Sequence, residues 1–427
     1  LGNLMENIII RGGESLSGQI PISGAKNSAL PLMATTLLTK ENITLRNVPA
    51  LDDIISMRDL LKGLGSEVLG DLKKGGAELT LNTNSIKDTE APYELVRKMR
   101  ASVLVLGPLL ARCGHARVSL PGGCAIGNRP VDIHLSGLEQ MGVSIDLKGG
   151  YIDATIAGNR RLKGARIAFP MVSVGATENL LMAATLAQGE TELINAAREP
   201  EIIDLANCLI SMGAKIQGHG TDTILISGVE ALNGAEHRVI SDRIEIGTYA
   251  IAACITGGQI DLLGADGTFL RAVFDTLRAS GAEIDENNWG LRIIGPKGKP
   301  KAIDIMTDPY PGFPTDLQAQ MMAYMTRVSG ASMITETIFE NRFMHVPELR
   351  RMGADINVHN STALVRGVSN LKGAPVMATD LRASVSLVLA GLAADGVTEI
   401  SRIYHLDRGY EDLVGKLVGC GAHIKRI

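Results

Sequence analysis

One short phrase occurs six times along the chain, and this repeat limits the possible folds more than any other feature. In each copy an amphipathic stretch leads to a glycine, a small or apolar residue and, shortly after, a β-branched residue. The six glycines are Gly65, Gly142, Gly213, Gly281, Gly353 and Gly421, spaced 77, 71, 68, 72 and 68 residues apart. Because glycine readily takes the left-handed conformation that ends a helix, each copy predicts a helix followed by a strand.

Each repeat has a second part, a run rich in alanine, leucine and methionine that is followed by an alternating strand. Examples of these runs are Ala29–Leu38, Ala176–Ala187, Gly247–Ile255 and Ala383–Ala394. They are apolar nearly all round, which predicts buried helices. The helix before each glycine is one-sided, as the spacing of Ile202, Leu205 and Leu209 indicates. Each unit should therefore contain a buried helix, a strand, an amphipathic helix and a pair of strands.

The repeats predict an α/β fold of two domains, each built from three units. An open solenoid is the alternative, but solenoid units are normally shorter, about 20 to 50 residues, and their end repeats are atypical. We place a crossing near Ile240, so that one domain comprises residues 25–240. The other is discontinuous and comprises residues 5–24 and 241–427, with Ile8–Ile10 and Gln19–Pro21 as its first strands.

Composition excludes several classes of function. The net charge of −4 gives no global attraction to nucleic acid or to membrane surfaces. Five cysteines, an odd number without zinc-site spacing, indicate a reducing compartment. The histidines have no ligand spacing either, so we expect no metal. The start at Met5 is too short and too acidic for a signal peptide, and residues 1–4 are set aside. The sequence reads as a soluble, cytoplasmic protein.

Basic residues recur at matched positions of the repeat. Arg129 and Arg408 each lie 13 residues before their glycine and Arg342 lies 11 before, so we expect all three to start amphipathic helices. Charged residues at the starts of the buried helices are Lys26, Arg100, Arg243, Asp316 and Arg382. If the helices of a domain are parallel, these ends face one way, and two facing domains would enclose a cationic cleft. A single arginine is more often a solvated helix end, but this set favours a site for a small polyanion.

The strongest local signal is the loop Leu120-Pro-Gly-Gly-Cys-Ala-Ile-Gly-Asn-Arg-Pro-Val-Asp-Ile-His134. Glycines flank Cys124, and Arg129 lies nearby, which favours a partly ionised thiol that is nucleophilic or able to transfer a proton. The alternative is a small residue buried in a turn. The other cysteines, Cys113, Cys208, Cys254 and Cys420, are expected to be structural.

Asp316 differs in charge from the basic residues at equivalent positions. One carboxylate among cations is a candidate general base, although Thr315 and Asp316 could equally be an ordinary helix cap. The sequence has no Gly-x-Gly-x-x-Gly motif and no Walker loop, and Lys26 lacks the Walker spacing.

Several long motifs together resemble the enolpyruvyl transferase family, and in particular its members whose acceptor is UDP-N-acetylglucosamine. The motifs are Ser23-Gly-Ala-Lys-Asn-Ser, Lys98-Met-Arg-Ala-Ser, Leu120-Pro-Gly-Gly-Cys-Ala-Ile-Gly, Arg129-Pro-Val-Asp, Asn195-Ala-Ala-Arg-Glu-Pro-Glu, Phe313-Pro-Thr-Asp, Glu340-Asn-Arg-Phe-Met-His, Ala378-Thr-Asp-Leu-Arg-Ala-Ser and Asp407-Arg-Gly-Tyr-Glu. They span nearly the whole chain.

The resemblance implies two inverted α/β domains with helices inside and sheets outside, each with three repeats in pseudo-threefold symmetry. It also implies an enzyme that transfers the enolpyruvyl group of phosphoenolpyruvate to the 3′-hydroxyl of UDP-N-acetylglucosamine, releasing phosphate, in the first committed step of peptidoglycan synthesis. Neither a metal nor an organic cofactor is implied. Alkylation by fosfomycin is expected at the family's cysteine.

The resemblance also assigns residues. The proton donor matches Cys124, the base on the 3′-hydroxyl matches Asp316, and Asp380 assists proton transfer. The cations for the donor's phosphate match Lys26, Arg129 and Arg408, and those for its carboxylate match Arg342 and Arg382. Contacts to the sugar nucleotide match Asn27, Arg100, Arg129, Pro130, Val131, Asp132, Ile133, Val172, Ser173, Val174, Gly175, Asp316, Ile338 and Phe339. Met171 stands where some members carry a lysine that meets the nucleotide phosphates.

Three rival interpretations remain. The shikimate-pathway enolpyruvyl transferase shares the fold and the donor, but it lacks the cysteine loop. A non-catalytic nucleotide sensor would not need Cys124 and Asp316. A cysteine hydrolase would need a histidine partner, and the sequence identifies none.

Overall fold

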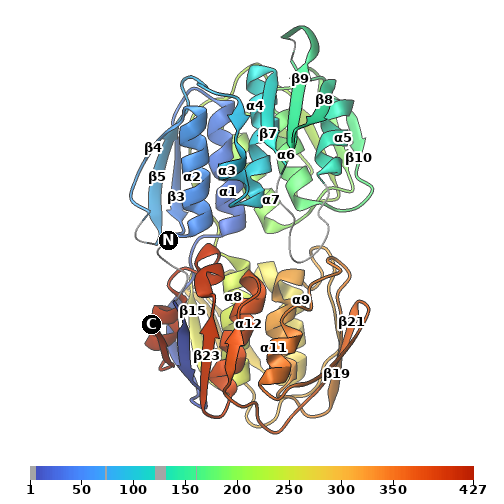
Figure 1. Ribbon diagram of the computed structural model, residues 1–427. Helices are drawn as coiled ribbons and strands as arrows, with labels where there is room; N and C mark the ends of the chain where they lie inside the picture. The colour runs from blue at the N-terminus through green and yellow to red at the C-terminus, as the bar shows by residue number, and fades with distance from the viewer. Residues whose placement is uncertain (1–5, 73–74, 121–130, 160) are drawn as a thin grey trace. The chain divides into compact units, whose positions relative to one another are not determined.

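Figure 1 shows the computed structural model of the chain, which describes residues 6–72, 75–120, 131–159 and 161–427. These residues form two compact units. The discontinuous unit holds residues 6–22 and 241–427, and the central unit holds the described residues from 23 to 240. Three residues of the expected site, Cys124, Arg129 and Pro130, lie outside the described residues.

Within the described ranges, the strands form six four-stranded sheets with one common topology. In each sheet an edge strand runs parallel to its neighbour, and the other two pairings are antiparallel. The sheets of the central unit are β14 (Ala235–Arg238), β3 (Ile43–Val48), β5 (Ala77–Asn82) and β4 (Glu67–Leu69); β6 (Glu90–Ala91), β7 (His115–Ser119), β9 (Tyr151–Ile156) and β8 (Val143–Lys148); and β10 (Arg166–Ala168), β11 (Glu190–Ile194), β13 (Thr223–Ser227) and β12 (Lys215–Gln217). Those of the discontinuous unit are β2 (Ser17–Pro21), β15 (Gln259–Leu263), β17 (Gly290–Ile294) and β16 (Glu283–Asn287); β18 (Ile305–Met306), β19 (Ala331–Thr335), β21 (Thr362–Arg366) and β20 (Asp355–His359); and β22 (Pro375–Met377), β23 (Val397–Ser401), β1 (Ile8–Arg11) and β24 (His423–Arg426).

The edge strands close each unit into a ring of three repeats. Each sheet takes its parallel edge strand from the end of the repeat before it. In the central unit β14 follows the third repeat but pairs with β3 of the first, with Ala235 opposite Ile43. In the discontinuous unit β2 follows β1 of the sixth sheet but pairs with β15, with Ser17 opposite Gln259. Because the strands close each unit into a ring, the open solenoid is excluded. A closed ring also needs no atypical end repeat.

Helices fill the inside of both units. The buried helices are α1 (Lys26–Ala34) with the 3₁₀ helix η1 (Thr35–Leu38), η2 (Arg100–Val105) with α4 (Leu106–Cys113), α6 (Val174–Ala184), α8 (Arg243–Thr256), η5 (Thr315–Leu317) with α10 (Gln318–Met325), and α12 (Leu381–Ala393). In α8 every residue before Thr256 is buried, whereas β13 buries only Ile224 and Ile226. Figure 1 shows α8 and α12 between β15 and β23 on one side and β19 and β21 on the other. Helices inside and sheets outside confirm the expected fold class.

The amphipathic helices are α2 (Asp52–Leu64), α5 (Asp132–Gln140), α7 (Pro200–Ser211), α9 (Arg271–Ser280), α11 (Val346–Arg351) and α13 (Leu413–Gly419). The six repeat glycines after them have φ values of 110°, 92°, 101°, 110°, 91° and 89° in chain order. This confirms the predicted left-handed helix ends. The remaining short elements are α3 (Tyr93–Val96), η3 (Ala157–Asn159), η4 (Gly267–Leu270) and η6 (Ile403–Arg408).

The prediction that Arg342 and Arg408 start amphipathic helices is wrong. Arg342 lies in the turn before α11, which begins at Val346 because Pro347 is tolerated only in the first turn of a helix. Arg408 ends η6. The helix α13 begins five residues later, where the side chain of Asp412 accepts a hydrogen bond from the Gly415 N–H at 3.1 Å. Arg342 is thus presented by a turn and Arg408 by the end of a 3₁₀ helix, and neither starts an amphipathic helix.

Candidate active site

The starts of the three buried helices of the discontinuous unit lie close together. Asp316 in η5 pairs with Arg382 at the start of α12. Asp242, the N-cap of α8, also acts on Arg382: burial lowers the pKa of that guanidinium, but the charges of Asp316 and Asp242 and the Tyr410 hydroxyl raise it overall. Helix starts carry free N–H groups and the positive end of the helix dipole, so the three helices favour negative charge at this corner of the unit.

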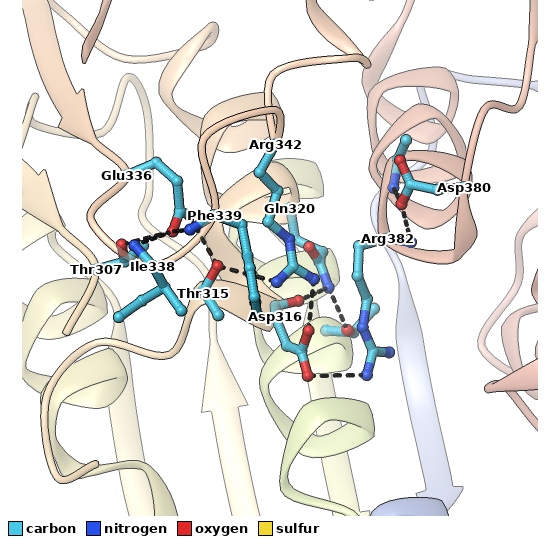
Figure 2. Close-up of polar contacts among 12 residues, drawn as sticks. Thr307, Thr315, Asp316, Gln320, Glu336, Ile338, Phe339, Arg342, Asp380 and Arg382 are labelled. Carbon is cyan, nitrogen blue, oxygen red and sulfur yellow. Dashed lines mark hydrogen bonds and ion pairs between the residues drawn. The ribbon is translucent and has the colours of Figure 1, made fainter. Parts of the chain in front are cut away.

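Asp316 forms two ion pairs at this corner (Figure 2). Arg342 Nη2 lies 2.5 Å from Asp316 Oδ1, and Arg382 Nη2 lies 3.3 Å from Oδ2. The side chains of Arg342 and Arg382 are only 4% and 8% exposed, while that of Asp316 is 25% exposed. Two buried guanidinium groups therefore converge on one carboxylate that still reaches solvent.

These pairs set the charge of Asp316. Burial opposes ionisation, but the charges of Arg382 and Arg342 and their hydrogen bonds outweigh it and hold the pKa of Asp316 well below its usual range. A carboxylate in this state is a weak base. Its basicity would increase if another anion took over part of the charge of the two arginines.

Arg342 is held on several sides. Its Nη1 donates to the Thr315 hydroxyl at 2.9 Å, and its guanidinium carbon lies 5.4 Å from the centre of the Phe339 ring. Among the described residues, no hydrogen-bond partner faces its buried Nε. The guanidinium thus keeps an unused donor although it is almost fully buried, which is unusual for a purely structural arginine.

A second carboxylate, Glu336, lies directly behind this arrangement and is 3% exposed. Its Oε1 accepts hydrogen bonds from Thr307 Oγ1 at 3.0 Å and from the N–H groups of Ile338 and Phe339 at 2.9 and 3.1 Å. Its Oε2 accepts one from Thr315 Oγ1 at 2.8 Å. Figure 2 shows these contacts in one continuous network with Arg342 and Asp316.

Polar groups of the buried helices complete the floor of the corner. Gln320 Nε2 donates to the Asp316 carbonyl at 2.9 Å and to Thr248 Oγ1 at 3.2 Å. The Tyr410 hydroxyl lies 3.0 Å from Thr248 Oγ1 and accepts from Arg382 Nη1 at 3.3 Å. Thr248 is in α8 and Gln320 in α10, so these bonds tie two buried helices to the position of Arg382.

Asp380 is the N-cap of α12. Its Oδ1 accepts from the N–H groups of Arg382 and Ala383 at 2.9 and 3.0 Å. A cap of this kind fixes the helix start that carries Arg382. The charge of Asp380 also reaches the buried His345, where burial dominates and lowers the pKa to about 4.

In the central unit, Lys26 at the start of α1 is also paired and buried. Its Nζ lies 3.1 Å from Asp53 Oδ2, and the two side chains are 11% and 6% exposed. Asp53 belongs to the first turn of α2. Asn27 follows Lys26 in α1 and is half-buried.

Arg100 at the start of η2 lies near His134 of α5. Burial, and then the charge of Arg100, lower the pKa of His134 to about 4. The neutral imidazole is held by Asn179, whose Nδ2 lies 3.1 Å from His134 Nδ1. A side chain added at Gly175 would come within 3.4 Å of His134 Cε1. Arg100, α5 and the start of α6 therefore share one corner of the central unit.

The start of α6 carries the remaining expected contacts in this corner. Ser173 caps the helix by accepting from the Ala176 N–H at 3.3 Å, and Val172, Val174 and Gly175 are half-buried beside it. Met171, directly before them, is 56% exposed. Val131, Asp132 and Ile133 lie at the start of α5, where Asp132 is exposed.

The central unit also buries three acidic residues together. Glu178, Glu199 and Glu201 are 4%, 8% and 2% exposed. Burial raises the pKa of Glu178 well above its usual range, and the charges of Glu201 and Glu199 raise it further. Both burial and like charge thus oppose ionisation of Glu178.

The structure thus brings together Asp316, Arg342, Arg382 and Asp380, and places Ile338 and Phe339 beside them. Arg408 is half-buried in η6. Burial, and then the charges of Arg402 and Arg408, lower the pKa of His405. Sequence analysis missed Glu336, Thr315 as an arginine partner, Gln320 and Tyr410. Tyr410 and His345 were within quoted motifs, but nothing in the order of residues distinguishes Glu336 from an ordinary residue at a strand end.

The four described cysteines are poor nucleophiles. Burial raises the pKa of Cys208 to about 12, and it also raises that of Cys113, Cys254 and Cys420. This agrees with the structural role expected for them. Across the described residues there is no group of three or more histidine, cysteine or acidic side chains that could hold a metal ion. A search of the same residues found no helix long and apolar enough to cross a membrane.

Comparison with known proteins extends these observations. The chain is 63% identical over 425 residues to UDP-N-acetylglucosamine 1-carboxyvinyltransferase of Granulibacter bethesdensis, which covers 99% of this chain and 100% of that protein. It is 61% identical over 431 residues to the protein of the same name from Rhodospirillum centenum, with 99% of both chains covered.

Solved structures show the same fold. The enolpyruvyl transferase NikO from Streptomyces tendae superposes with a TM-score of 0.87 at 25% identity and covers 99% of both chains. An EPSP synthase from Acinetobacter baumannii superposes with a TM-score of 0.77 at 18% identity, over 99% of this chain and 100% of that one. The family described as EPSP synthase (3-phosphoshikimate 1-carboxyvinyltransferase) matches residues 10–417. With this match over nearly its whole length, the chain belongs to the enolpyruvyl transferase family.

Proposed function

We propose that the chain transfers the enolpyruvyl group of phosphoenolpyruvate to the 3′-hydroxyl of UDP-N-acetylglucosamine and releases phosphate. The observation that carries this proposal is the near-complete coverage, at 63% identity, of a relative that bears the name of this activity. The reaction is the first committed step of peptidoglycan synthesis. Both substrates are cytoplasmic metabolites, so we place the protein in the cytoplasm.

The donor is a small anion with a phosphate and a carboxylate, and it needs several cations. We assign its carboxylate to Arg342 and Arg382, whose convergence on Asp316 supports this role. We assign its phosphate to Lys26, Arg129 and Arg408. A donor carboxylate would compete with Asp316 for the two arginines. The pKa of Asp316 would then rise, so that donor binding itself would make Asp316 a better base.

The acceptor is assigned to two groups of residues. In the central unit we assign it to Asn27, Arg100, Arg129–Ile133 and Val172–Gly175. In the discontinuous unit we assign it to Asp316, Ile338 and Phe339. The segment at Ile338 and Phe339 is held by Glu336 through two backbone hydrogen bonds, which supports a fixed contact surface.

The chemistry proceeds by addition and elimination. Cys124 gives a proton to C3 of the donor, which leaves an electron-poor carbon at C2. The 3′-oxygen of the sugar bonds to C2 while Asp316 accepts the hydroxyl proton. Loss of a proton from C3, assisted by Asp380, then restores the double bond, and the C2–O bond to phosphate breaks with the electron pair leaving on phosphate. Positive charges around the departing phosphate lower the barrier.

The test is phosphate release with each candidate acceptor. We expect release from phosphoenolpyruvate with UDP-N-acetylglucosamine and none above background with shikimate 3-phosphate. The reverse result would assign the chain to the acceptor named in its family description. Release with neither acceptor would favour a non-catalytic sensor.

Cys124 gives a second test of the same proposal. Cys124→Ala should abolish phosphate release at neutral pH while the thermal melting temperature is unchanged, because general acid catalysis contributes roughly 10²–10⁴-fold. Fosfomycin should add one alkyl group at Cys124 in an intact-mass and peptide analysis. Full activity of the variant, or an adduct at another residue, would remove Cys124 from the mechanism.

A further inference from the structure

We propose that Glu336 is a positioning residue for both substrates. Through one buried carboxylate it sets the direction of the arginine assigned to the donor and fixes the backbone segment assigned to the acceptor. The inference rests on the proposed function, which assigns Arg342 to the donor and Ile338 and Phe339 to the acceptor. We call the contacts that lead from Glu336 through Thr315 to Arg342 the first arm, and those to the backbone of Ile338 and Phe339 the second arm. Glu336 itself touches neither substrate in this scheme.

Glu336 is well placed to connect two elements. It directly follows β19, and its own N–H donates to the Ser361 carbonyl at 2.8 Å, so its backbone is fixed. Its carboxylate accepts four hydrogen bonds, at 2.8 to 3.1 Å, from Thr307, from Thr315 and from the turn at Ile338 and Phe339. Within the described chain, no ion pair is formed by Glu336, and these four direct donors are neutral groups. Such a buried carboxylate is costly to keep unless its hydrogen bonds are all satisfied.

The first arm runs through Thr315. A threonine hydroxyl has a single hydrogen, and at 2.8 Å that hydrogen is given to Glu336 Oε2. The lone pairs of the hydroxyl are then directed to Arg342 Nη1 at 2.9 Å. Thr315 therefore connects the two side chains. Glu336 orients the Thr315 hydroxyl, and that hydroxyl orients the Arg342 guanidinium, which also pairs with Asp316 (Figure 2).

The second arm is a backbone clamp. Oε1 accepts from two successive N–H groups, those of Ile338 and Phe339, and so fixes the turn after β19. Thr307 supports the same oxygen at 3.0 Å, and its hydroxyl accepts from the Thr337 N–H at 2.9 Å. The arms meet again where the Phe339 ring lies 5.4 Å from the Arg342 guanidinium carbon.

The two threonines allow the arms to be separated. Thr315 and Thr307 donate to the same carboxylate, but only Thr315 contacts Arg342. Thr315→Val should raise KM for phosphoenolpyruvate roughly tenfold, the effect of losing one hydrogen bond to a charged group, with KM for UDP-N-acetylglucosamine within about twofold. Thr307→Val should do the opposite and raise KM mainly for UDP-N-acetylglucosamine. Glu336→Ala should raise both, because it removes the carboxylate that both arms share.

Controls distinguish positioning from a general loss of stability. Thr315→Ser keeps the hydroxyl and should restore the wild-type KM for phosphoenolpyruvate. Thr315→Ala serves as a second variant if Thr315→Val melts below the assay temperature. Equal changes in both KM values for Thr315→Val, or no change in either, would overturn the proposal, as would failure of Thr315→Ser to restore KM.

The experiment also separates this inference from the proposed function. If the wild type uses shikimate 3-phosphate in place of UDP-N-acetylglucosamine, the proposed acceptor is wrong. The effect of Thr315→Val on KM for phosphoenolpyruvate would still test the first arm, because both reactions share that donor. Absence of turnover with either acceptor would overturn both proposals together.

Discussion

Each unit contains a buried carboxyl group, and the pKa values of these two groups are shifted in opposite directions. Asp316 of the discontinuous unit is held between two arginines, and its pKa lies well below the usual range. Glu178 of the central unit is buried with Glu199 and Glu201, and its pKa lies well above the usual range. Each side chain belongs to the buried helical layer of its own unit, Asp316 in η5 and Glu178 in α6. Burial acts to raise both pKa values, and the charged neighbours determine whether that rise is reinforced, as at Glu178, or reversed, as at Asp316.

The opposite pKa shifts distinguish a carboxyl group that we expect only to pack in the core, Glu178, from one that we propose takes part in the chemistry, Asp316. Burial and its acidic neighbours disfavour ionisation of Glu178, so we expect that a neutral isostere can replace it. Asp316 pairs with two buried guanidinium groups, so its removal leaves charge less well compensated and also removes the proposed base. The role of a residue that departs from the repeat pattern can therefore be inferred only when the charged groups around it are known.

The largest expected effect comes from replacing the carboxyl group of Asp316 with an amide, compared with the same change at Glu178. Asp316→Asn should lower kcat for phosphate release by roughly 10²–10⁴-fold, because the general base is lost. Glu178→Gln is the matched control in the other unit and should keep kcat within about twofold. Steady-state assays with both substrates measure the contrast, and similar losses in the two variants would refute it.

A smaller effect is expected in the pH dependence of stability. The folded pKa of Glu178 is raised, so the unfolded chain ionises first, near the ordinary glutamate pKa of about 4.3, and stability falls as pH rises above that value. Glu178→Gln removes this loss. The variant should melt a few degrees above wild type at neutral pH, and the advantage should vanish near pH 4.

Asp316 should show the opposite sign. Its folded pKa is depressed, so its contribution to stability is present above an unfolded pKa of about 3.9 and is lost as pH falls toward the folded value. Asp316→Asn should therefore destabilise the protein at neutral pH, and the difference from wild type should shrink in acid. Melting curves of both variants at neutral pH and near pH 3 measure the two signs. Parallel pH profiles would contradict the comparison.

The smallest effect concerns the exposed surface of the central unit. Met171→Lys should tighten binding of UDP-N-acetylglucosamine by a few-fold at low salt, because an added cation would meet the diphosphate, and high salt should remove the gain. The KM for phosphoenolpyruvate should not change. Calorimetric titration with the sugar nucleotide at two salt concentrations measures the change in its affinity. Met171→Gln is the uncharged control.

Much of the fold could be predicted from the sequence, because the repeat glycines and the apolar runs directly report helix ends and buried helices. The edge strands were missed where they are only two or three residues long, as in β6, β10, β18 and β22, because so few residues carry no periodicity. The helix starts at Arg342 and Arg408 were misplaced, since Pro347 and Asp412 determine them locally.

The site was only partly predictable. Charged residues at repeat positions identified Asp316, Arg342 and Arg382, but sequence spacing gives no distances, so their mutual pairing could not be foreseen. Glu336 was not identified because its role depends on side chains from three separate segments. The opposite charge states of Asp316 and Glu178 likewise depend on burial and on neighbours distant in sequence.

The pairing of the first and last strands has a consequence for biosynthesis. The strand β1 pairs with β24, and the N–H and carbonyl of Asn7 each bond to Ile427 at 2.9 Å, so this edge of β1 is paired only after residues 423–427 have been made. The central unit has all its strands once β14 has emerged from the ribosome. At typical elongation rates of about 5–20 residues per second, β1 then waits roughly 10 to 40 s for β24, whereas β15, the partner of β2, follows β14 within about 1 to 5 s. During translation these nascent strands have open edges and are natural targets for chaperones that shield extended segments.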